Sequence, residues 1–330
     1  MISRLQRLLP LEDIVDQIQQ YQGEPLQLGK AEYFILQLFS IPRIRSRLKC
    51  LAFYFRFSEE YAEIIPDVTI IRAATQEVLT SPIFAYILQI VLVSGNYLNR
   101  DTFRGNAHGF KIQSLNNLRS TVSNNSQANP TLLHFLCRTL ANKKPATIDF
   151  INTMPNVKSA SFVSIKSLVE GVKELEMGLK FIHAELREPI ISTPADEFRS
   201  KMEKFIGKST KKMASLKEKI SIMSKELNEM LVALGEEETL ESSDSFFTQI
   251  SLFAKDLQKC NTENQVYDLH QKGLYQSQSS LADSSINVSG NDPDTEGPKA
   301  AIQLTKLVLN GNSLSMARKT IKKALGTGAV

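Results

Sequence analysis

The residues IKSLVEGVKELEMGLKFIHAEL, at positions 165–186, decide the fold class of this chain. Their apolar side chains recur at alternating steps of three and four residues, at Ile165, Leu168, Val172, Leu175, Leu179, Ile182 and Leu186. This spacing is a heptad seam, typical of a long helix that packs lengthwise against another helix. The stretch therefore predicts an all-α fold built on long helices.

A second seam follows Pro189 and Pro194. Its members are Phe198, Met202, Phe205, Ser209, Met213, Leu216, Ile220, Met223, Leu227, Met230 and Leu234. Two four-residue steps meet at Ser209, which is a stutter in the heptad. Because only Glu188 to Ala195 joins the seams, we expect an antiparallel, coiled-coil-like pair of helices, each roughly 35–60 Å long at 1.5 Å per residue. An elongated helical bundle is the predicted architecture.

Upstream of the seams, the stretch GNYLNRDTFRGNAHGFKIQSLNNL at 95–118 breaks the helical pattern. It follows an apolar run, Ile83–Val93, and is rich in glycine and asparagine, the residues most tolerant of unusual backbone angles. Phe110 to Ile112 returns to apolar packing. We predict a shaped connector between two helices, and connectors of this length are often functional.

The residues before this connector predict more helices. Apolar spacing marks one helix after Pro10 within 4–22 and another within 30–50, which Pro42 ends. Residues 66–93 predict two further helices with a break near Ser81 and Pro82. Residues 51–64 are rich in aromatic side chains, at Phe53, Tyr54, Phe55, Phe57 and Tyr61. A helical face continues through Leu51, Tyr54, Phe55, Ile64 and Ile65, which favours core packing over stacking on single-stranded nucleic acid.

Basic residues crowd the stretch after Pro42, at Arg43, Arg45, Arg47 and Lys49. On a helix these positions spread over more than half of the circumference. Two readings stay open: a solvated face, or a contact for an acidic protein surface.

The residues after the connector predict further helices, followed by a linker and a tail. After the polar loop Thr121–Pro130, Thr131 is placed to cap a helix. Gly235 is expected to end the second seam, and a last helix with Phe246, Phe247, Ile250, Phe253, Ala254 and Leu257 is expected to reach about Asn264. Residues rich in Ser, Asn, Asp, Gly and Pro follow, so we predict three parts: a helical domain over 1–264, a disordered linker over 265–299 and a basic amphipathic tail over 300–330.

Composition narrows the class of protein. The 330 residues are 42% hydrophobic and 22% charged with a net charge of +4, which is typical of a core-forming protein. Cys50, Cys137 and Cys260 are far apart and indicate no disulfide framework. No secretory pattern follows Met1, and the run Ile83–Val93 is too short to span a bilayer. These features predict a cytoplasmic protein without a membrane span.

Motifs for chemistry are missing from the sequence. Gly95, Gly105 and Gly109 do not form a dinucleotide-binding pattern, and no phosphate-binding loop occurs. His134 and Cys137 share a helix face, but no second ligand pair completes a zinc site. We therefore expect a binding scaffold rather than an enzyme, with no cofactor and no nucleic-acid partner.

Several stretches, in order, resemble the formin homology two domain over about residues 4–264. They are IPRIRSRLKCLAFYFRFSE at 41–59, GNYLN at 95–99, GFKIQSLNNL at 109–118, TLLHFL at 131–136 and ALGE at 233–236. The resemblance implies a helical domain that binds actin and works as a head-to-tail homodimer. In the family an arm of one subunit, the lasso, encircles the post of the other, and the ring nucleates filaments and stays on the growing barbed end.

The resemblance also implies site residues. The lasso-receiving surface of the post corresponds to Gly95, Asn96, Tyr97, Asn99, Gly109, Phe110 and Leu115. Lys111 matches a basic post position associated with actin contact. Arg119, Arg43 and Arg47 are further candidates, because basic residues complement the acidic surface of actin.

The sequence departs from the family in two places. Segments matching the lasso and the first knob helices are expected ahead of Met1, so we expect an N-terminally truncated form that nucleates actin poorly and whose homodimer is impaired. The loop SNNSQANP at 123–130 replaces a charged loop. The alternative reading is a non-nucleating helical scaffold that binds actin filaments or other cytoskeletal partners.

The tail carries a shorter resemblance. Leu307, Leu314, Arg318 and Lys319 lie in an apolar run followed by basic residues. This pattern is similar to the diaphanous-type autoregulatory segment and to a WASP-homology actin-binding peptide. An unattached amphipathic end is the third reading.

Overall fold

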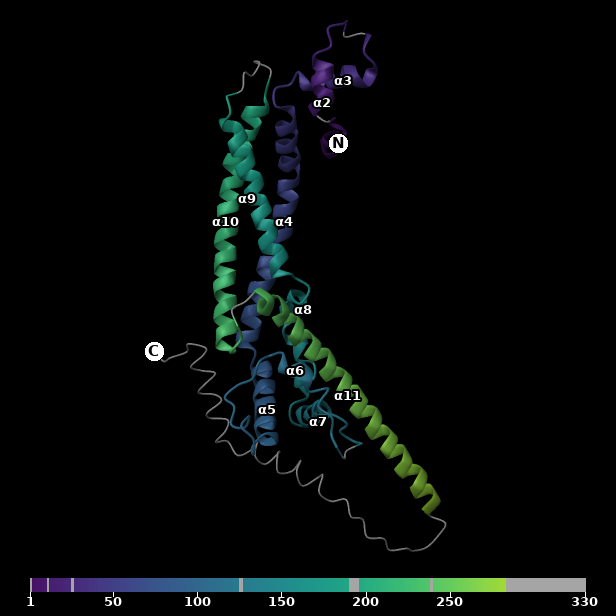
Figure 1. Ribbon diagram of the computed structural model, residues 1–330. Coiled ribbons are helices and arrows are strands. Elements are labelled where there is room, and N and C mark those ends of the chain that lie inside the picture. Colours follow the sequence, from purple (N-terminus) through teal and green to yellow (C-terminus); the bar gives the residue numbers. More distant parts are fainter. Residues whose placement is uncertain are drawn as a thin grey trace, which may run out of the picture. The chain divides into compact units, whose positions relative to one another are not determined.

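The computed structural model describes residues 2–10, 12–24, 27–124, 127–189, 196–237 and 240–282 (Figure 1). It divides into two compact units, each of which is described by itself. Unit 1 comprises Met1–Val68 and Lys166–Ile222, and unit 2 comprises Thr69–Ile165 and Met223–Val330. Within the described ranges the regular structure is helical, and the one β contact is an isolated bridge between Val122 and Thr131. The predicted all-α class is confirmed.

Unit 1 is built on three long helices that lie side by side (Figure 1). They are the first part of α4 (Ile44–Thr80), nearly all of α9 (Ile165–Arg187) and the first part of α10 (Phe198–Ala233). Lys217 of α10 pairs with Glu176 of α9 at 2.5 Å, and Arg199 donates to the Leu186 carbonyl at 2.7 Å. Since the α10 residue numbers rise as the α9 numbers fall, the two helices are antiparallel, as the seams predict.

An aromatic cluster joins α4 to α10 in unit 1. The Phe205 ring meets Phe57 at 5.4 Å and Tyr54 at 5.0 Å, both edge to face. Phe53 and Phe57 are buried, as the core-packing interpretation predicts. However, Phe55 is 65% exposed and Tyr54 is 38% exposed, so the core-packing interpretation is wrong for these two side chains. They lie at the edge of the contact between α4 and α10, because three-helix packing buries only a stripe of each helix.

Short helices make up the start of unit 1. These are α1 (Ile2–Leu8), α2 (Glu12–Gln19) and α3 (Lys30–Phe39), and α2 packs on α3. The helix expected after Pro10 is confirmed as α2, and α1 lies ahead of Pro10, whose ring disfavours helix continuation.

Helix α4 runs through Pro66, where the sequence predicted a separate helix. Pro66 and Ala62 are both exposed, so the Ala62 carbonyl, which loses its intrahelical donor, is left facing water. Ile64 and Val68 are buried and hold the flanking turns. The predicted break at Ser81 and Pro82 is confirmed, because α5 begins at Pro82 and the Ser81 hydroxyl accepts from the Phe84 N–H at 3.2 Å.

Unit 2 gathers α5 (Pro82–Leu98), α6 (Ser114–Asn117), α7 (Leu132–Lys143), α8 (Pro155–Ala160) and α11 (Leu240–Ala282). Two 3₁₀ turns, Pro145–Thr147 and Phe150–Thr153, link α7 to α8. Helix α11 packs on α6, α7 and α8. Phe150 stacks on Phe84 at 5.7 Å and lies 6.0 Å from Phe253, which ties α5 to α11 through one core.

The predicted end of α10 is observed, whereas α11 ends later than predicted. Gly235 has φ +74, and the Glu236 N–H bonds to the Leu231 carbonyl at 2.9 Å, which is the closing turn expected after a long helix. Helix α11 continues to Ala282, beyond the end expected at about Asn264. No proline interrupts 265–282, and a helix already nucleated by a buried stretch extends at low cost.

Among the described residues, no individual helix combines the length and apolarity that a bilayer span requires. One bent pair, α4 with α5, meets those two criteria jointly.

Gly178 supplies a test of the unit 1 packing. A Cβ built at Gly178 would lie 2.1 Å from the Phe53 ring. We expect Gly178→Ala to lower the free energy of unfolding by roughly 1 kcal/mol, since overpacking by about 1–3 kcal/mol outweighs the gain of about 1 kcal/mol in helix propensity. Urea denaturation measures this change.

Gly207→Ala in α10 is the matched control, because a Cβ there meets no atom within 4 Å. It should leave the protein equally or more stable. A stabilising Gly178→Ala would show that Phe53 does not press on α9.

Candidate functional site

The connector predicted at 95–118 begins one turn later than expected. Gly95, Asn96 and Tyr97 still belong to α5, which ends at Leu98. Asn99 caps the helix and its side chain donates to the Gly95 carbonyl at 2.8 Å. The irregular part therefore runs from Asn99 to Gln113, ahead of α6.

Asn96 holds this irregular part against α5. Its Nδ2 donates to the Ala107 carbonyl at 2.9 Å, and its Oδ1 accepts from the Ala107 N–H at 2.8 Å. One amide side chain thus satisfies both backbone groups of a loop residue eleven positions away. The connector is shaped by asparagine, in agreement with its predicted role.

The glycine that the loop geometry requires is Gly105. A Cβ there would lie 2.5 Å from the Asn99 carbonyl oxygen, so only glycine permits this approach. Asn106 adopts φ +57, the left-handed region that asparagine tolerates. At Gly95 and Gly109 a Cβ would meet no atom within 4 Å, so local packing does not require glycine at these two positions.

The far end of the connector is clamped to the turn after α10. The Ile112 N–H donates to the Glu236 carboxylate at 2.6 Å, and Lys111 Nζ pairs with Glu237 at 2.7 Å. The hydrogen bond to Glu237 raises the pKa of Lys111, and the same bond lowers the pKa of Glu237. The Lys111 side chain remains 52% exposed, so it is accessible to a partner.

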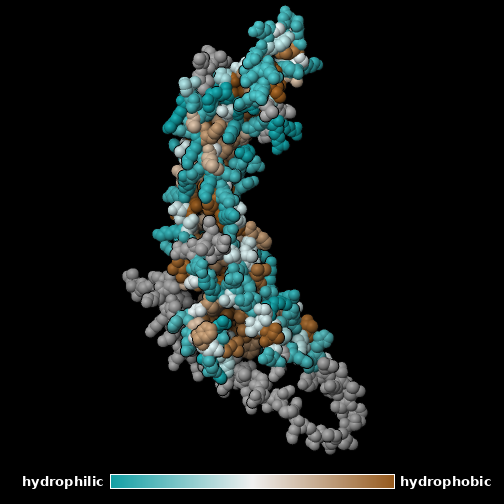
Figure 2. Space-filling model, in the orientation of Figure 1, coloured by the Kyte–Doolittle hydropathy of each residue, from teal (hydrophilic) through white to brown (hydrophobic). Residues whose placement is uncertain are grey.

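Apolar side chains reach the surface around the connector. Phe103 is 92% exposed and Leu98 is 54% exposed, while Tyr97 and Phe110 are half-buried. Figure 2 shows hydrophobic residues at the surface over the α5 and α7 region of unit 2. We call Tyr97, Leu98, Phe103, Phe110 and Lys111 the connector surface. Leu115, by contrast, is fully buried, so it does not belong to this surface.

Arg119 faces α11. Its guanidinium donates to Asp256 at 3.2 Å and to Glu263 at 3.1 Å, and its side chain is 27% exposed. Glu263 also bonds to His134 Nε2 at 2.8 Å. Burial works against ionisation of Glu263, but the bond from His134 and the charge of Arg119 outweigh it and lower the pKa of this carboxyl.

His134, Cys260 and Glu263 form the one group of candidate metal ligands within the described ranges, with ligand atoms within 4.8 Å of one another. This set was not found from sequence, where Cys137 seemed the only neighbour of His134. Both imidazole nitrogens already have partners, since Nδ1 lies 2.7 Å from the Thr131 hydroxyl. The Arg119 guanidinium already binds the Glu263 carboxylate. Burial raises the pKa of Cys260 to about 11, which disfavours the thiolate that a metal would need. The arrangement fits a polar link between α7 and α11 better than a cation site.

Thr131 occupies the expected cap position of α7, yet its hydroxyl makes no bond to the helix backbone. It bonds to His134 instead. The predicted capping bond is therefore wrong. The Thr131 hydroxyl bonds to an imidazole one turn along the helix, which can act as donor or acceptor, and not to a backbone N–H.

The basic residues after Pro42 are engaged within unit 1. Arg43 pairs with the buried Glu185 at 2.6 Å, and Arg47 pairs with Asp196 at 2.7 Å while stacking on Phe198. Arg47 has only 8% of its side chain exposed. The solvated-face interpretation is wrong for Arg47, whose charge is used to hold the start of α10.

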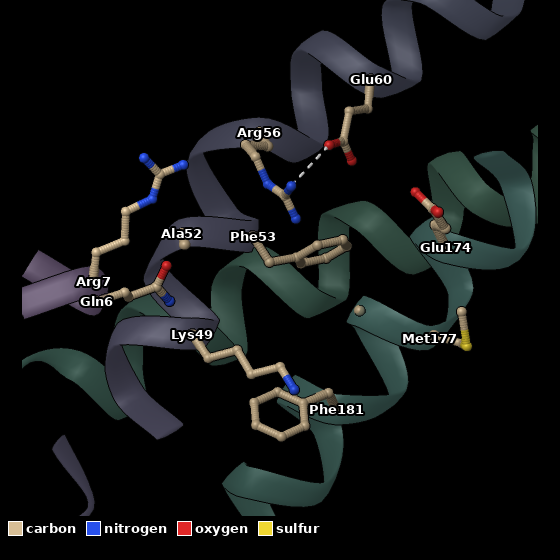
Figure 3. A pocket seen from close by; sticks show the side chains of 11 residues that line it. Gln6, Arg7, Lys49, Ala52, Phe53, Arg56, Glu60, Glu174, Met177 and Phe181 are labelled. Carbon is tan, nitrogen blue, oxygen red and sulfur yellow. Dashed lines mark ion pairs between the residues drawn. The ribbon is translucent and has the colours of Figure 1, made fainter. Parts of the chain in front are cut away.

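Unit 1 also holds a cavity of about 890 Å³ between α1, α4 and α9 (Figure 3). Phe53 lies across it, Arg56 pairs with Glu60 at 3.6 Å, and Lys49 lies over the Phe181 ring at 4.3 Å. Charges of both signs therefore line the cavity, and each labelled cation has a carboxylate or ring close by except Arg7 at its edge.

The predicted tail residues Leu307, Leu314, Arg318 and Lys319 lie outside the described residues. Their roles stay predictions.

Comparison with known proteins places the chain among formins. A family model, the Formin Homology 2 Domain, matches residues 1–258. Formin-like protein 21b of Arabidopsis thaliana is 32% identical over 237 residues, which cover 72% of this chain and 58% of that protein. Formin-H of Dictyostelium discoideum is 30% identical over 266 residues, covering 79% and 24%.

Disheveled-associated activator of morphogenesis 1 of Homo sapiens is 29% identical over 266 residues, covering 80% of this chain and 24% of that protein. The chain spans less than two thirds of the length of these relatives.

The Asn96 clamp predicts a local loss of order. We expect Asn96→Ala to lower stability by about 1–3 kcal/mol, because two backbone groups of Ala107 lose their partners. Hydrogen exchange of residues 103–110 should accelerate. Asn117→Ala, at an exposed position of α6, is the control and should change neither quantity. Equal exchange in both variants would contradict the clamp.

The lowered pKa of Glu263 predicts a pH dependence. A carboxyl whose folded pKa lies below its ordinary 4.5 stabilises the protein above that pH, and this contribution is lost as the pH falls through the folded value. Glu263→Gln should therefore be less stable than the parent at neutral pH. The gap between their urea midpoints should close at acid pH, whereas a gap that stays constant would show that Glu263 carries no charge-dependent stabilisation.

Proposed function

Because the chain belongs to the formin family through its formin homology 2 domain, we propose that it is an actin-binding module of the cytoskeleton. The proposed activity is that of the family: nucleation of actin filaments and processive elongation at barbed ends. The connector surface of unit 2 is the part that would receive the arm of a second subunit.

The observation that carries this proposal is that residues 98–111 contain both exposed apolar side chains and an accessible lysine. Leu98 is exposed at the end of α5, and Phe103 is exposed on the connector that Asn96, Gly105 and Ile112 hold in shape. Large exposed apolar groups that are rimmed by polar residues mark interaction sites. Lys111 adds a positive charge at the edge of that surface, which suits contact with an acidic protein such as actin.

The four basic candidates for actin contact do not support the proposal equally. Lys111 is bound to the exposed Glu237 and can exchange that partner at small cost, since surface pairs contribute little. Arg47 would have to leave a buried pair with Asp196. Arg43 and Arg119 also hold carboxylates of neighbouring helices. We therefore assign actin contact to Lys111 first.

The second candidate is a helical scaffold that does not nucleate. It is favoured by the internal pairing of Arg43, Arg47 and Arg119, which leaves fewer charges for actin than the sequence suggests.

Charge reversal at Lys111 tests the proposal. Lys111→Glu should abolish cosedimentation with actin filaments and any acceleration of pyrene-actin assembly, because it places a negative charge against acidic actin beside Glu236 and Glu237. The thermal stability should change little, since both partners of the pair are exposed.

Two controls separate contact from pairing. Glu237→Gln removes the same ion pair but keeps the lysine, and it should retain actin binding. Lys158→Glu reverses an exposed charge on α8 of the same unit and should also retain it. If Lys111→Glu binds actin as the parent does, the scaffold function is the better account.

A further inference from the structure

Unit 1 carries a groove of about 570 Å³ between α4 and α10, separate from the connector surface. Lys204, Lys208 and Lys212 of α10 form one bank. Tyr54 and Phe55 of α4 form the other, and Phe205 lies between them. We call this the basic-aromatic groove.

Three lysines of the groove make no ion pair with a described residue, although the hydrogen bond from Lys201 and, after it, the charge of Lys204 lower the pKa of Glu197. Lys201, at one end, pairs with Glu197 at 2.8 Å, and Lys212 lies 5.5 Å over the Tyr61 ring. Across the described ranges, no carboxylate lies within ion-pair distance of Lys204, Lys208 or Lys212, and no acidic residue lines the groove. All three side chains are exposed. Like charges that face one shared hollow attract an anionic partner.

The opposite bank is apolar and open. Phe55 is 65% exposed and Tyr54 is 38% exposed, although each ring is large enough to be buried if a partner covered it. Phe57, at 1% exposure, closes the floor. The groove therefore offers a row of positive charge alongside a row of aromatic surface.

The spacing of the lysines sets the geometry of a partner. Positions 204, 208 and 212 are four residues apart on one face of a helix, so successive lysines rise by about 6 Å. An acidic helix with carboxylates at every fourth position has the same rise. Its neighbouring face at i+1 and i+5 would then lie over the aromatic bank, as in other helix-in-groove interactions.

We propose that the basic-aromatic groove binds an acidic amphipathic helix of a partner protein. Glu or Asp at positions i, i+4 and i+8 pair with Lys204, Lys208 and Lys212, and apolar residues beside them cover Phe55 and Tyr54. The binding goes beyond actin contact at Lys111, because it uses only residues of unit 1.

Two other polyanions fit the groove less well. Tyr54 meets Phe55 and Phe205 edge to face at 5.0 Å, so its ring is already engaged by protein neighbours, whereas base stacking needs free flat faces. A bilayer surface would reach the lysines but not the aromatic floor between the two helices.

Fluorescence anisotropy with the 330-residue chain tests the proposal. The probe is a labelled peptide of about 18 residues, roughly 27 Å as a helix, with Glu at every fourth position and Leu next to each Glu. Binding is expected, and it should weaken as salt rises. Lys204→Glu combined with Lys208→Glu should weaken it by about tenfold or more. Phe55→Ser should weaken it at constant charge.

The matched control combines Lys211→Glu with Lys219→Glu, which changes the net charge equally on the same helix, at exposed positions outside the groove. It should bind within about twofold of the parent. A scrambled peptide of the same composition should bind more weakly, because its acidic and apolar rows are lost.

Four results would overturn the proposal. They are absence of peptide binding, equal losses in the two double variants, equal binding of the scrambled peptide, or tighter lysine-dependent binding of an oligothymidylate or of phosphatidylserine vesicles. Loss of actin cosedimentation in the Lys204 and Lys208 variant, but not in the control variant, would assign the groove to actin instead.

Discussion

Lengthwise burial of apolar seams is the constraint on which the rest of unit 1 depends. Helices α4, α9 and α10 each carry a stripe that must face the others, and only one side of each helix can be buried in that way. Ion pairs such as Arg43 with Glu185 and Arg47 with Asp196 then close the end of the bundle. What remains outside the stripe, including Phe55 and the lysines of α10, is available for partners.

Unit 2 depends on a different constraint, because its irregular connector has to be held in one conformation. Side chains do this in place of regular backbone pairing: Asn96 binds Ala107, and Glu236 binds the Ile112 N–H. The turn at Gly235 delivers Glu236 and Glu237 to the connector, so the end of one long helix positions the surface carried by another segment. A formin homology 2 domain with this arrangement presents Phe103 and Leu98 on a braced support.

Some basic residues are held in ion pairs within the fold, whereas others are exposed to solvent. Arg47 is joined to Asp196, which lies just ahead of α10, and Arg119 is joined to carboxylates of α11. The buried thiols of Cys50 and Cys137 stay neutral, because burial raises their pKa values to about 12. Lys111, Lys204 and Lys208 project into solvent. Counting basic residues along the chain therefore overestimates the charge that a partner meets, and it hides where that charge is concentrated.

The sequence by itself determined the helical class, the two seams, the helix start at Pro82, the closing turn at Gly235 and the special character of residues 95–118, because these depend on local spacing and backbone preferences. Tertiary structure alone decided which polar groups meet. The partners of Arg119 lie 137 and 144 residues away, and the acids that bind Lys111 and Ile112 lie 126 and 124 residues away. It also carried α4 through Pro66, by burying the turns on both sides, and left Tyr54 and Phe55 outside the core. Local spacing places a side chain on a face of its helix, but only the packing of distant segments decides whether that face is covered.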